Sequence, residues 1–165
     1  MVSQDYDVAV SFSQYERFTF AEKDPNRKTD PRYDNELINR RFYNAMQQIF
    51  SEKGYTYTSI PAESDVTVSF SYSVRPKMDL YNIGRQVGFS YGSYHRYGGI
   101  SAPTCTDISE FDQGILFIDI RDNQTGRLIW RGTGADIVSI HATPEVLQNQ
   151  VEEMVSAVLK QFPPG

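Results

Sequence analysis

The residues best suited to acid–base or nucleophilic chemistry are few and stand apart in the sequence. His95 and His141 are the two histidines, and neither belongs to a spacing typical of a metal site. Ser90 lies in the segment Gly88-Phe89-Ser90-Tyr91-Gly92, which matches the spacing of a hydrolase nucleophile elbow. That elbow requires a strand before the serine and a helix after it, and neither pattern is present. We interpret the match as chance and expect two surface histidines that lie far apart, neither in a deep polar pocket.

Asp119 and Asp122 flank Arg121 at the end of an expected strand and are a second candidate, as a carboxylate pair for acid–base catalysis. Their spacing along a strand points them to opposite faces, so Asp122 is expected to bond the backbone of the following turn. The single cysteine, Cys105, has no base placed near it by any motif and is expected to be a passive thiol. The sequence therefore predicts no metal site and no cofactor.

A segment rich in tyrosine and glycine, residues 76–107, has no sustained hydrophobic period. Tyrosine gives a large contact area at small entropic cost, so the segment suits the binding of planar or sugar ligands. A surface loop whose tyrosines fold back on the domain is an equally good interpretation. At least two of Tyr91, Tyr94 and Tyr97 are expected to be exposed. The candidate binding residues are Tyr81, Arg85, Phe89, Tyr91, Tyr94, His95, Arg96 and Tyr97.

Length and composition limit the elements that can position these residues. A chain of 165 residues is expected to form a single domain, 1–165, because domains average roughly 150 residues. The net charge of -5 repels polyanions, so we expect no nucleic-acid partner. The longest apolar run, at Ile115–Ile118, is far shorter than the roughly 20 residues that cross a bilayer.

Alternating apolar and polar residues predict strands in both halves of the chain. In the clearest one, Val66, Val68, Phe70, Tyr72 and Val74 are expected to face helices, while Thr67, Ser69, Ser71 and Ser73 face water. The expected strands are 6–12, 55–58, 66–74, 115–120 and 128–133, the last two joined by a hairpin turn that contains Gly126, and residues 17–20 are expected to be a short extended piece.

Helical spacing of apolar residues predicts two long helices. The first is expected from Asp34, as N-cap, to Lys53, with Gly54 ending it. The second begins after Thr143, with Pro144 in the first helical position, and stops before Pro163. The fold class is α+β: a two-layer sandwich in which a mostly antiparallel sheet of about five strands carries both helices on one face.

The expected strand 115–120 is apolar on both faces. If Leu116, Ile118 and Ile120 point inward, Ile115 and Phe117 emerge on the open face of the sheet. An uncovered apolar patch marks a contact site, so something is expected to cover these side chains. The candidates are the segment 76–107 folding back, which we favour, a second copy of the protein, or another partner.

The second half of the chain resembles a known family. The residues that carry the resemblance are Phe111–Asp122, Gly126–Gly132 and the helix that begins Pro144-Glu145 and ends Phe162-Pro163-Pro164. They are similar to a family of bacterial envelope proteins, domain of unknown function 4136. Asp5–Asp7, Lys53–Tyr55 and Ser64–Val66 agree with it in the first half.

The resemblance implies a lipoprotein with its signal peptide removed, held by a lipid on an N-terminal cysteine at the periplasmic side of the outer membrane. It supplies no catalytic residues. The signature residues are expected to have structural roles: Gly114 and Gly126 in turns, Trp130 in the core beside a solvated Arg131, and Pro163 as a helix stop.

The leading hypothesis is a non-catalytic envelope lipoprotein domain that binds an envelope protein or glycan through exposed aromatic residues. Contact with the membrane would be made only through the lipid anchor. One alternative is a small hydrolase or other small-molecule enzyme using His95, Ser90 or Asp119. The other is a structural subunit of an envelope assembly that buries the open face of the sheet.

Overall fold

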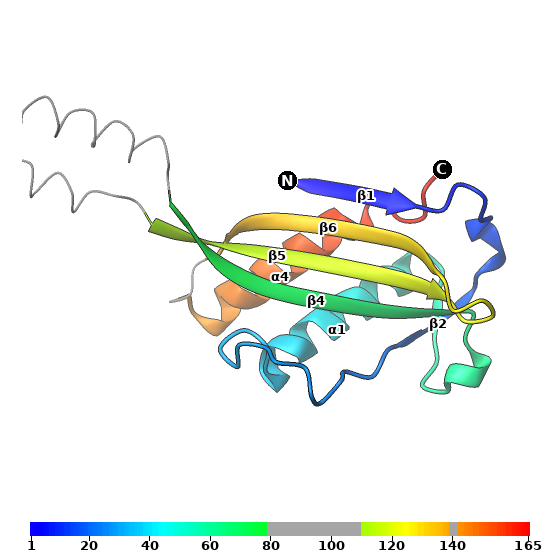
Figure 1. Ribbon diagram of the computed structural model, residues 1–165, viewed down its shortest axis with the longest axis horizontal. Coiled ribbons are helices and arrows are strands. Elements are labelled where there is room, and N and C mark those ends of the chain that lie inside the picture. Colours follow the sequence, from blue (N-terminus) through cyan, green and yellow to red (C-terminus); the bar gives the residue numbers. More distant parts are fainter. Residues whose placement is uncertain (79–109, 139–141) are drawn as a thin grey trace, which may run out of the picture.

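The computed structural model describes residues 1–78, 110–138 and 142–165. They form two layers, a six-stranded sheet with two helices packed on one face (Figure 1). The expected α+β sandwich with both helices on one side is therefore correct. The elements are β1 (Val2–Tyr6), β2 (Arg17–Phe20), α1 (Glu36–Glu52), β3 (Thr56–Tyr57), β4 (Val66–Met78), β5 (Glu110–Asp122), β6 (Leu128–Val138) and α4 (Pro144–Leu159).

The sheet is mixed and has one strand more than the sequence predicts. Its strand order is β1-β6-β5-β4-β2-β3, and β2 runs parallel to both β3 and β4 while the other neighbours are antiparallel. The parallel pairs follow from connectivity, because α1 lies between β2 and its two partner strands. A chain that leaves a sheet through a helix and returns beside the first strand returns parallel to it.

The first strand does not cover residues 6–12 as expected but lies earlier, at Val2–Tyr6. It pairs with β6 from Val2 opposite Gly134 to Tyr6 opposite Trp130. The chain then turns, because the Asp7 carboxylate accepts from the Ala9 backbone N–H at 2.9 Å. Val8 is consequently 86% exposed, and the alternation of apolar residues there does not mark a strand.

Both helices begin at a capping side chain. At the start of α1, Asn35 Oδ1 accepts from the Ile38 N–H at 3.1 Å, so Asn35 is the N-cap and the expected Asp34 is not. Gly54 follows α1 with a φ of +94°, the left-handed conformation expected for it. Thr143 caps α4 and Pro144 takes its first position, as predicted.

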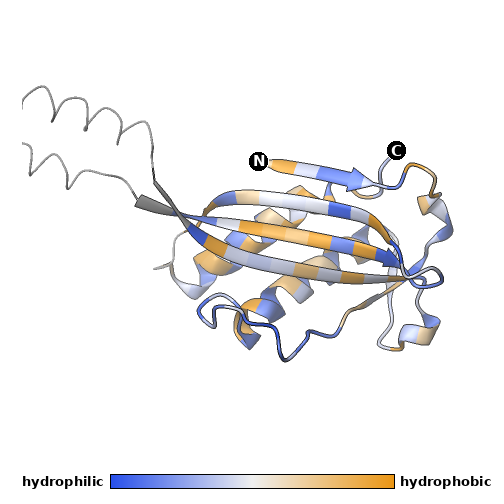
Figure 2. Ribbon diagram, viewed as in Figure 1, coloured by the Kyte–Doolittle hydropathy of each residue, from blue (hydrophilic) through white to orange (hydrophobic). Residues whose placement is uncertain are grey.

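The core fills the space between the helices and the sheet, where apolar residues line the facing surfaces (Figure 2). Val66, Val68 and Phe70 are buried against the helices, as predicted, and Phe42 of α1 stacks on Phe70 at 5.1 Å between ring centroids. The side chain of Trp130 is completely buried, which confirms its core position, and its Nε1 donates to Gln4 Oε1 at 3.0 Å.

Glycines have two different roles in this sheet. Gly126 has a φ of +70° in the hairpin turn, as predicted. Gly114, expected in a turn, lies within β5, where an added Cβ would stand 2.7 Å from the Tyr72 hydroxyl. It is a glycine because the Tyr72 ring occupies the space that a side chain would take. Of the helices in the described ranges, none is long and apolar enough to cross a membrane.

Candidate functional site

Most of the predicted chemistry lies outside the residues that the structure describes. This holds for the candidate binding residues Tyr81, Arg85, Phe89, Tyr91, Tyr94, His95, Arg96 and Tyr97, and for Ser90, Cys105 and His141. The expected separation of the histidines and exposure of the tyrosines therefore stay predictions. Within the described ranges, no group of three or more His, Cys, Asp or Glu side chains could hold a metal ion.

The two aspartates considered for catalysis are separated and bonded to other groups. Asp122 accepts from the Tyr15 hydroxyl at 2.8 Å and from the Gln124 backbone N–H at 2.7 Å, so its predicted role in the turn is confirmed. Asp119 lies on the open face and accepts two hydrogen bonds of 2.7 Å from the Arg131 guanidinium. This pairing occupies both carboxylate oxygens, which does not suit a general base.

The open face of the sheet, opposite the helices, is the candidate site. Strand register places Phe117 between Ser71 of β4 and Thr133 of β6, and Ile115 between Ser73 and Ala135. Ile115 and Phe117 therefore emerge on the open face, as predicted, and are half-buried. Ile137 extends the apolar strip and is 60% exposed. Sequence patterns missed Ile137, because the expected strand ended at residue 133.

Arg131 organises the centre of this face. It lies opposite Asp119 on one side and Asp5 on the other, and its guanidinium carbon is 5.6 Å from the centroid of the Phe117 ring. The hydrogen bond to Asp119 raises the pKa of Arg131. A guanidinium held by a carboxylate lies favourably against an aromatic face, so Arg131 covers part of Phe117 while it stays solvated.

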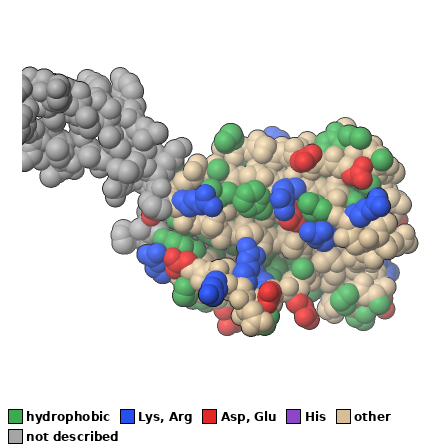
Figure 3. Space-filling view, viewed as in Figure 1, with side chains coloured by type: hydrophobic (Ala, Val, Ile, Leu, Met, Phe, Trp, Pro, Cys, Tyr) green, Lys and Arg blue, Asp and Glu red, His purple; other side chains and the backbone are tan. Residues whose placement is uncertain are grey.

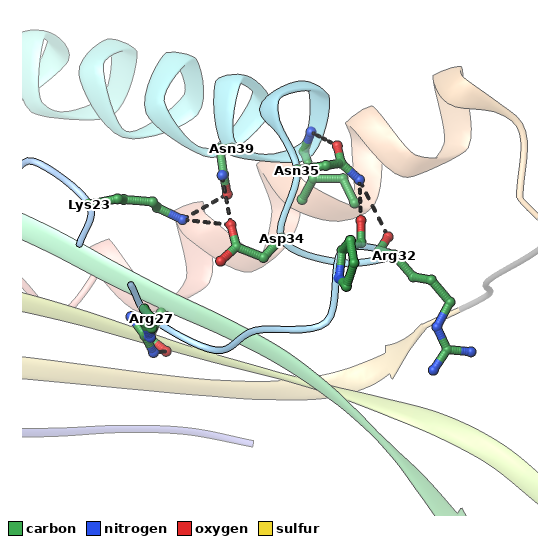
Figure 4. Close-up of polar contacts among 9 residues, drawn as sticks. Lys23, Arg27, Arg32, Asp34, Asn35 and Asn39 are labelled. Atoms are coloured by element: carbon green, nitrogen blue, oxygen red, sulfur yellow. Dashed lines mark hydrogen bonds and ion pairs between the residues drawn. The ribbon is translucent and has the colours of Figure 1, made fainter. Parts of the chain in front are cut away.

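The loop between β2 and α1 brings Arg27 to the edge of this face and is anchored to α1 by Lys23 and Asp34. Lys23 Nζ donates to Asn39 Oδ1 at 2.8 Å and lies 3.2 Å from the Asp34 carboxylate (Figure 4). A hydrogen bond from Thr29, together with those from Asn39 and Lys23, lowers the pKa of Asp34 to about 2. The loop is thereby tied to α1, and its Arg27 donates to Ser71 Oγ at 2.6 Å.

Positive charge dominates the open face. The strands place four exposed arginines there against the carboxylates of Asp5 and Asp119, and the loop adds Arg27. Figure 3 shows Lys and Arg side chains interspersed with hydrophobic ones across this side of the molecule. The whole chain carries -5, so the remaining surface is correspondingly negative. The four strand arginines are Arg17, Arg75, Arg121 and Arg131.

This arrangement suits binding better than catalysis. Arginine and aromatic residues are the side chains enriched at protein contacts, and a flat sheet offers a large surface. The polar groups described on this face include serine and threonine hydroxyls, arginine guanidinium groups and the carboxylates of Asp5 and Asp119, and none of them is a base placed beside a nucleophile. The fold and this surface define an α+β domain with a basic, partly apolar sheet face.

The comparisons with known proteins identify the family. The family model for the domain of unknown function DUF4136 matches residues 2–164, so the chain belongs to that family. A solved structure of a DUF4136 family protein from Bacteroides thetaiotaomicron is similar, with a TM-score of 0.51 and 16% identity over 99% of this chain and 95% of that one. Among the curated proteins, none matches the chain.

Two further solved structures share the fold. A PelC dodecamer from Paraburkholderia phytofirmans has a TM-score of 0.54 and 9% identity, covering 96% of this chain and 94% of that one. A PDZ domain protein from Parabacteroides distasonis has a TM-score of 0.58 and 14% identity over 99% of this chain. This chain spans only 35% of the length of that protein. At these identities the likeness shows the fold alone.

Proposed function

We propose that this domain is a non-catalytic binding module of the bacterial envelope that associates with further copies of itself through the open face of its sheet. The observation that carries the proposal is the apolar strip of Ile115, Phe117 and Ile137 set among arginines. Sheet faces that mix exposed apolar residues with arginine are typical of contact surfaces rather than of free surfaces.

Charge complementarity favours a second copy as the occupant. The open face is basic, whereas the chain as a whole carries -5, so a different and acidic surface of another copy is its natural complement. A contact between two different surfaces of the same chain is head-to-tail, and repetition of such a contact closes into a ring when the rotation permits. The similar PelC structure is a dodecamer, which makes a closed assembly of this fold a reasonable expectation.

Sedimentation of the wild-type protein and the Phe117→Asp variant tests this proposal. The wild type is expected to sediment as a concentration-dependent oligomer that dissociates as salt is raised, because ionic contacts between exposed groups are screened. Phe117→Asp is expected to be a monomer with an unchanged melting temperature. The matched control is Val8→Asp, which places the same charge at a residue that is 86% exposed in the turn after β1.

Two results would contradict the proposal. One is a monomeric wild type at all concentrations. The other is a monomeric Phe117→Asp variant whose melting temperature falls by several degrees, which is the result expected if residues 76–107 cover Phe117 within one chain.

The envelope location and the lipid anchor rest on the family resemblance. We expect the protein of native cells to fractionate with the outer membrane and to incorporate labelled palmitate. A native protein that is released with the periplasmic contents and takes up no label would exclude the anchor.

A further inference from the structure

A second feature, on the helix side of the molecule and independent of the open face, is a hollow between the first halves of α1 and α4. Its volume is about 90 Å³, and β4 and β6 form its floor. Most of its wall is apolar, formed by Ile38, Phe42, Val74, Leu147, Val151 and Met154.

Polar groups are placed at a few points of this wall. Arg32 and Arg41 both line the hollow, and Arg32 is paired with Asp30 at 2.7 Å. Arg41 forms no ion pair with any residue in the described ranges. Tyr72 also lines the hollow, and burial raises the pKa of its phenol to about 12.

Gln150 supplies a buried polar atom, Oε1, that lacks a hydrogen-bond partner among the described residues. Leaving such an atom unpaired costs free energy, which a bound donor or acceptor would recover. Rotation about the last side-chain bond exchanges Oε1 with Nε2, so the Gln150 amide can donate to an anion. The residue lines the hollow together with Arg41 and Tyr72.

The dipoles of the two helices add a positive electrostatic potential at the hollow. Both start at this end of the domain, because the hollow is lined by Ile38 near the start of α1 and Leu147 near the start of α4. Their course in Figure 1 is side by side and in the same direction. The positive ends of both helix dipoles therefore reinforce Arg41 in attracting a negative group.

We propose that this hollow binds a small amphiphile, a carboxylate attached to a short hydrocarbon chain. The chain lies among the apolar side chains, and Arg41 and the Gln150 amide bind the carboxylate. The volume of the hollow agrees with a short chain. An apolar cavity of about 150 Å³ holds benzene, so one of about 90 Å³ that opens to solvent admits a chain of a few carbons.

Titration of the ¹⁵N-labelled protein with hexanoate, hexanol and hexylammonium tests the charge preference at constant chain length. Amide shifts of residues 36–42 and 147–154 are expected to move and saturate with hexanoate, to move less with hexanol, and not to respond to hexylammonium. Equal responses to hexanoate and hexylammonium would overturn the proposal, as would hexanoate shifts confined to β5 and β6 on the open face.

A pair of adjacent arginines gives a matched control. Arg41→Gln is expected to weaken hexanoate binding about tenfold, equivalent to about 1.4 kcal/mol. Arg40→Gln removes the same charge from a residue that is paired with Glu36 and does not line the hollow, and should leave binding unchanged. Val151→Phe, which fills the hollow, should abolish the responses to hexanoate and hexanol. Equal hexanoate affinities of the Arg41→Gln and Arg40→Gln variants would refute the site even if Val151→Phe does not fold.

Discussion

Replacing Gly132 by alanine should destabilise the domain more than any surface change, because α4 packs directly on the backbone of β6 at this residue. An added Cβ would overlap the Trp130 ring and stand 2.5 Å from Val158 Cγ1. Neither neighbour has room to move, since Trp130 and Val158 are both completely buried. Gly134, on the same face, meets Val158 in the same way, at 2.6 Å from Cγ2.

The magnitude follows from the number of contacts involved. Overpacking a well-filled core by one methyl group costs roughly 1–3 kcal/mol of stability. Because both neighbours of Gly132 are rigid, the expected cost of Gly132→Ala is about 3 kcal/mol. For a domain of this size that is a fall in melting temperature of roughly 6–12 °C. Urea unfolding followed by the fluorescence of Trp130, the single tryptophan, measures the free energy directly.

The matched control is Thr133→Ala, which changes the next residue of β6 on the opposite, open face. It should cost less than about 1 kcal/mol, the range of strand propensities. A Gly132→Ala variant no less stable than Thr133→Ala would show that α4 can move away from β6. The close packing of helix on strand would then not be what selects glycine at this position.

Three further predictions concern the bonds that hold loops and caps. Because the pKa of Asp34 is lowered to about 2, its carboxylate stabilises the fold above its ordinary pKa of about 4, and this is lost as pH falls through 2. Asp34→Asn should therefore flatten the melting temperature between pH 5 and pH 2, whereas an unchanged slope would contradict this. Asn35→Ala should lose about 1 kcal/mol of stability in urea, because α1 loses its N-cap. Tyr15→Phe should cost roughly 1 kcal/mol through the lost bond to Asp122, and because the pKa of Tyr15 is about 12, the tyrosine absorbance of the variant should rise less near pH 12 than that of the wild type.

The sequence by itself determined the elements whose signals are local. Both helices follow from the spacing of apolar residues and from Thr143, Pro144 and Gly54 at their ends, since each cap acts within one turn. The central strands and their inward faces follow from alternation, because successive side chains of a strand must point to opposite sides. The emergence of Phe117 on the open face could therefore be deduced before any contact was known.

Tertiary structure alone decided which residues meet across long distances in the chain. The Asn35 cap replaced Asp34 because Lys23 and Asn39 take the Asp34 carboxylate, and Lys23 lies at the other end of the same loop, outside any local capping pattern. Gly114 was mistaken for a turn residue because nothing near it in sequence shows that Tyr72 lies against it. A glycine's role depends on what occupies the space beside it.

The two candidate sites also differ in how far the sequence predicts them. The open face could be predicted in part, since Ile115 and Phe117 belong to one strand and share its alternation. The hollow could not be predicted, because Arg41, Tyr72 and Gln150 come from α1, β4 and α4 and no spacing relates them. Local sequence fixes the face on which a side chain lies, through backbone geometry. Only the packing of helices on the sheet decides which of those faces leave a cavity between them.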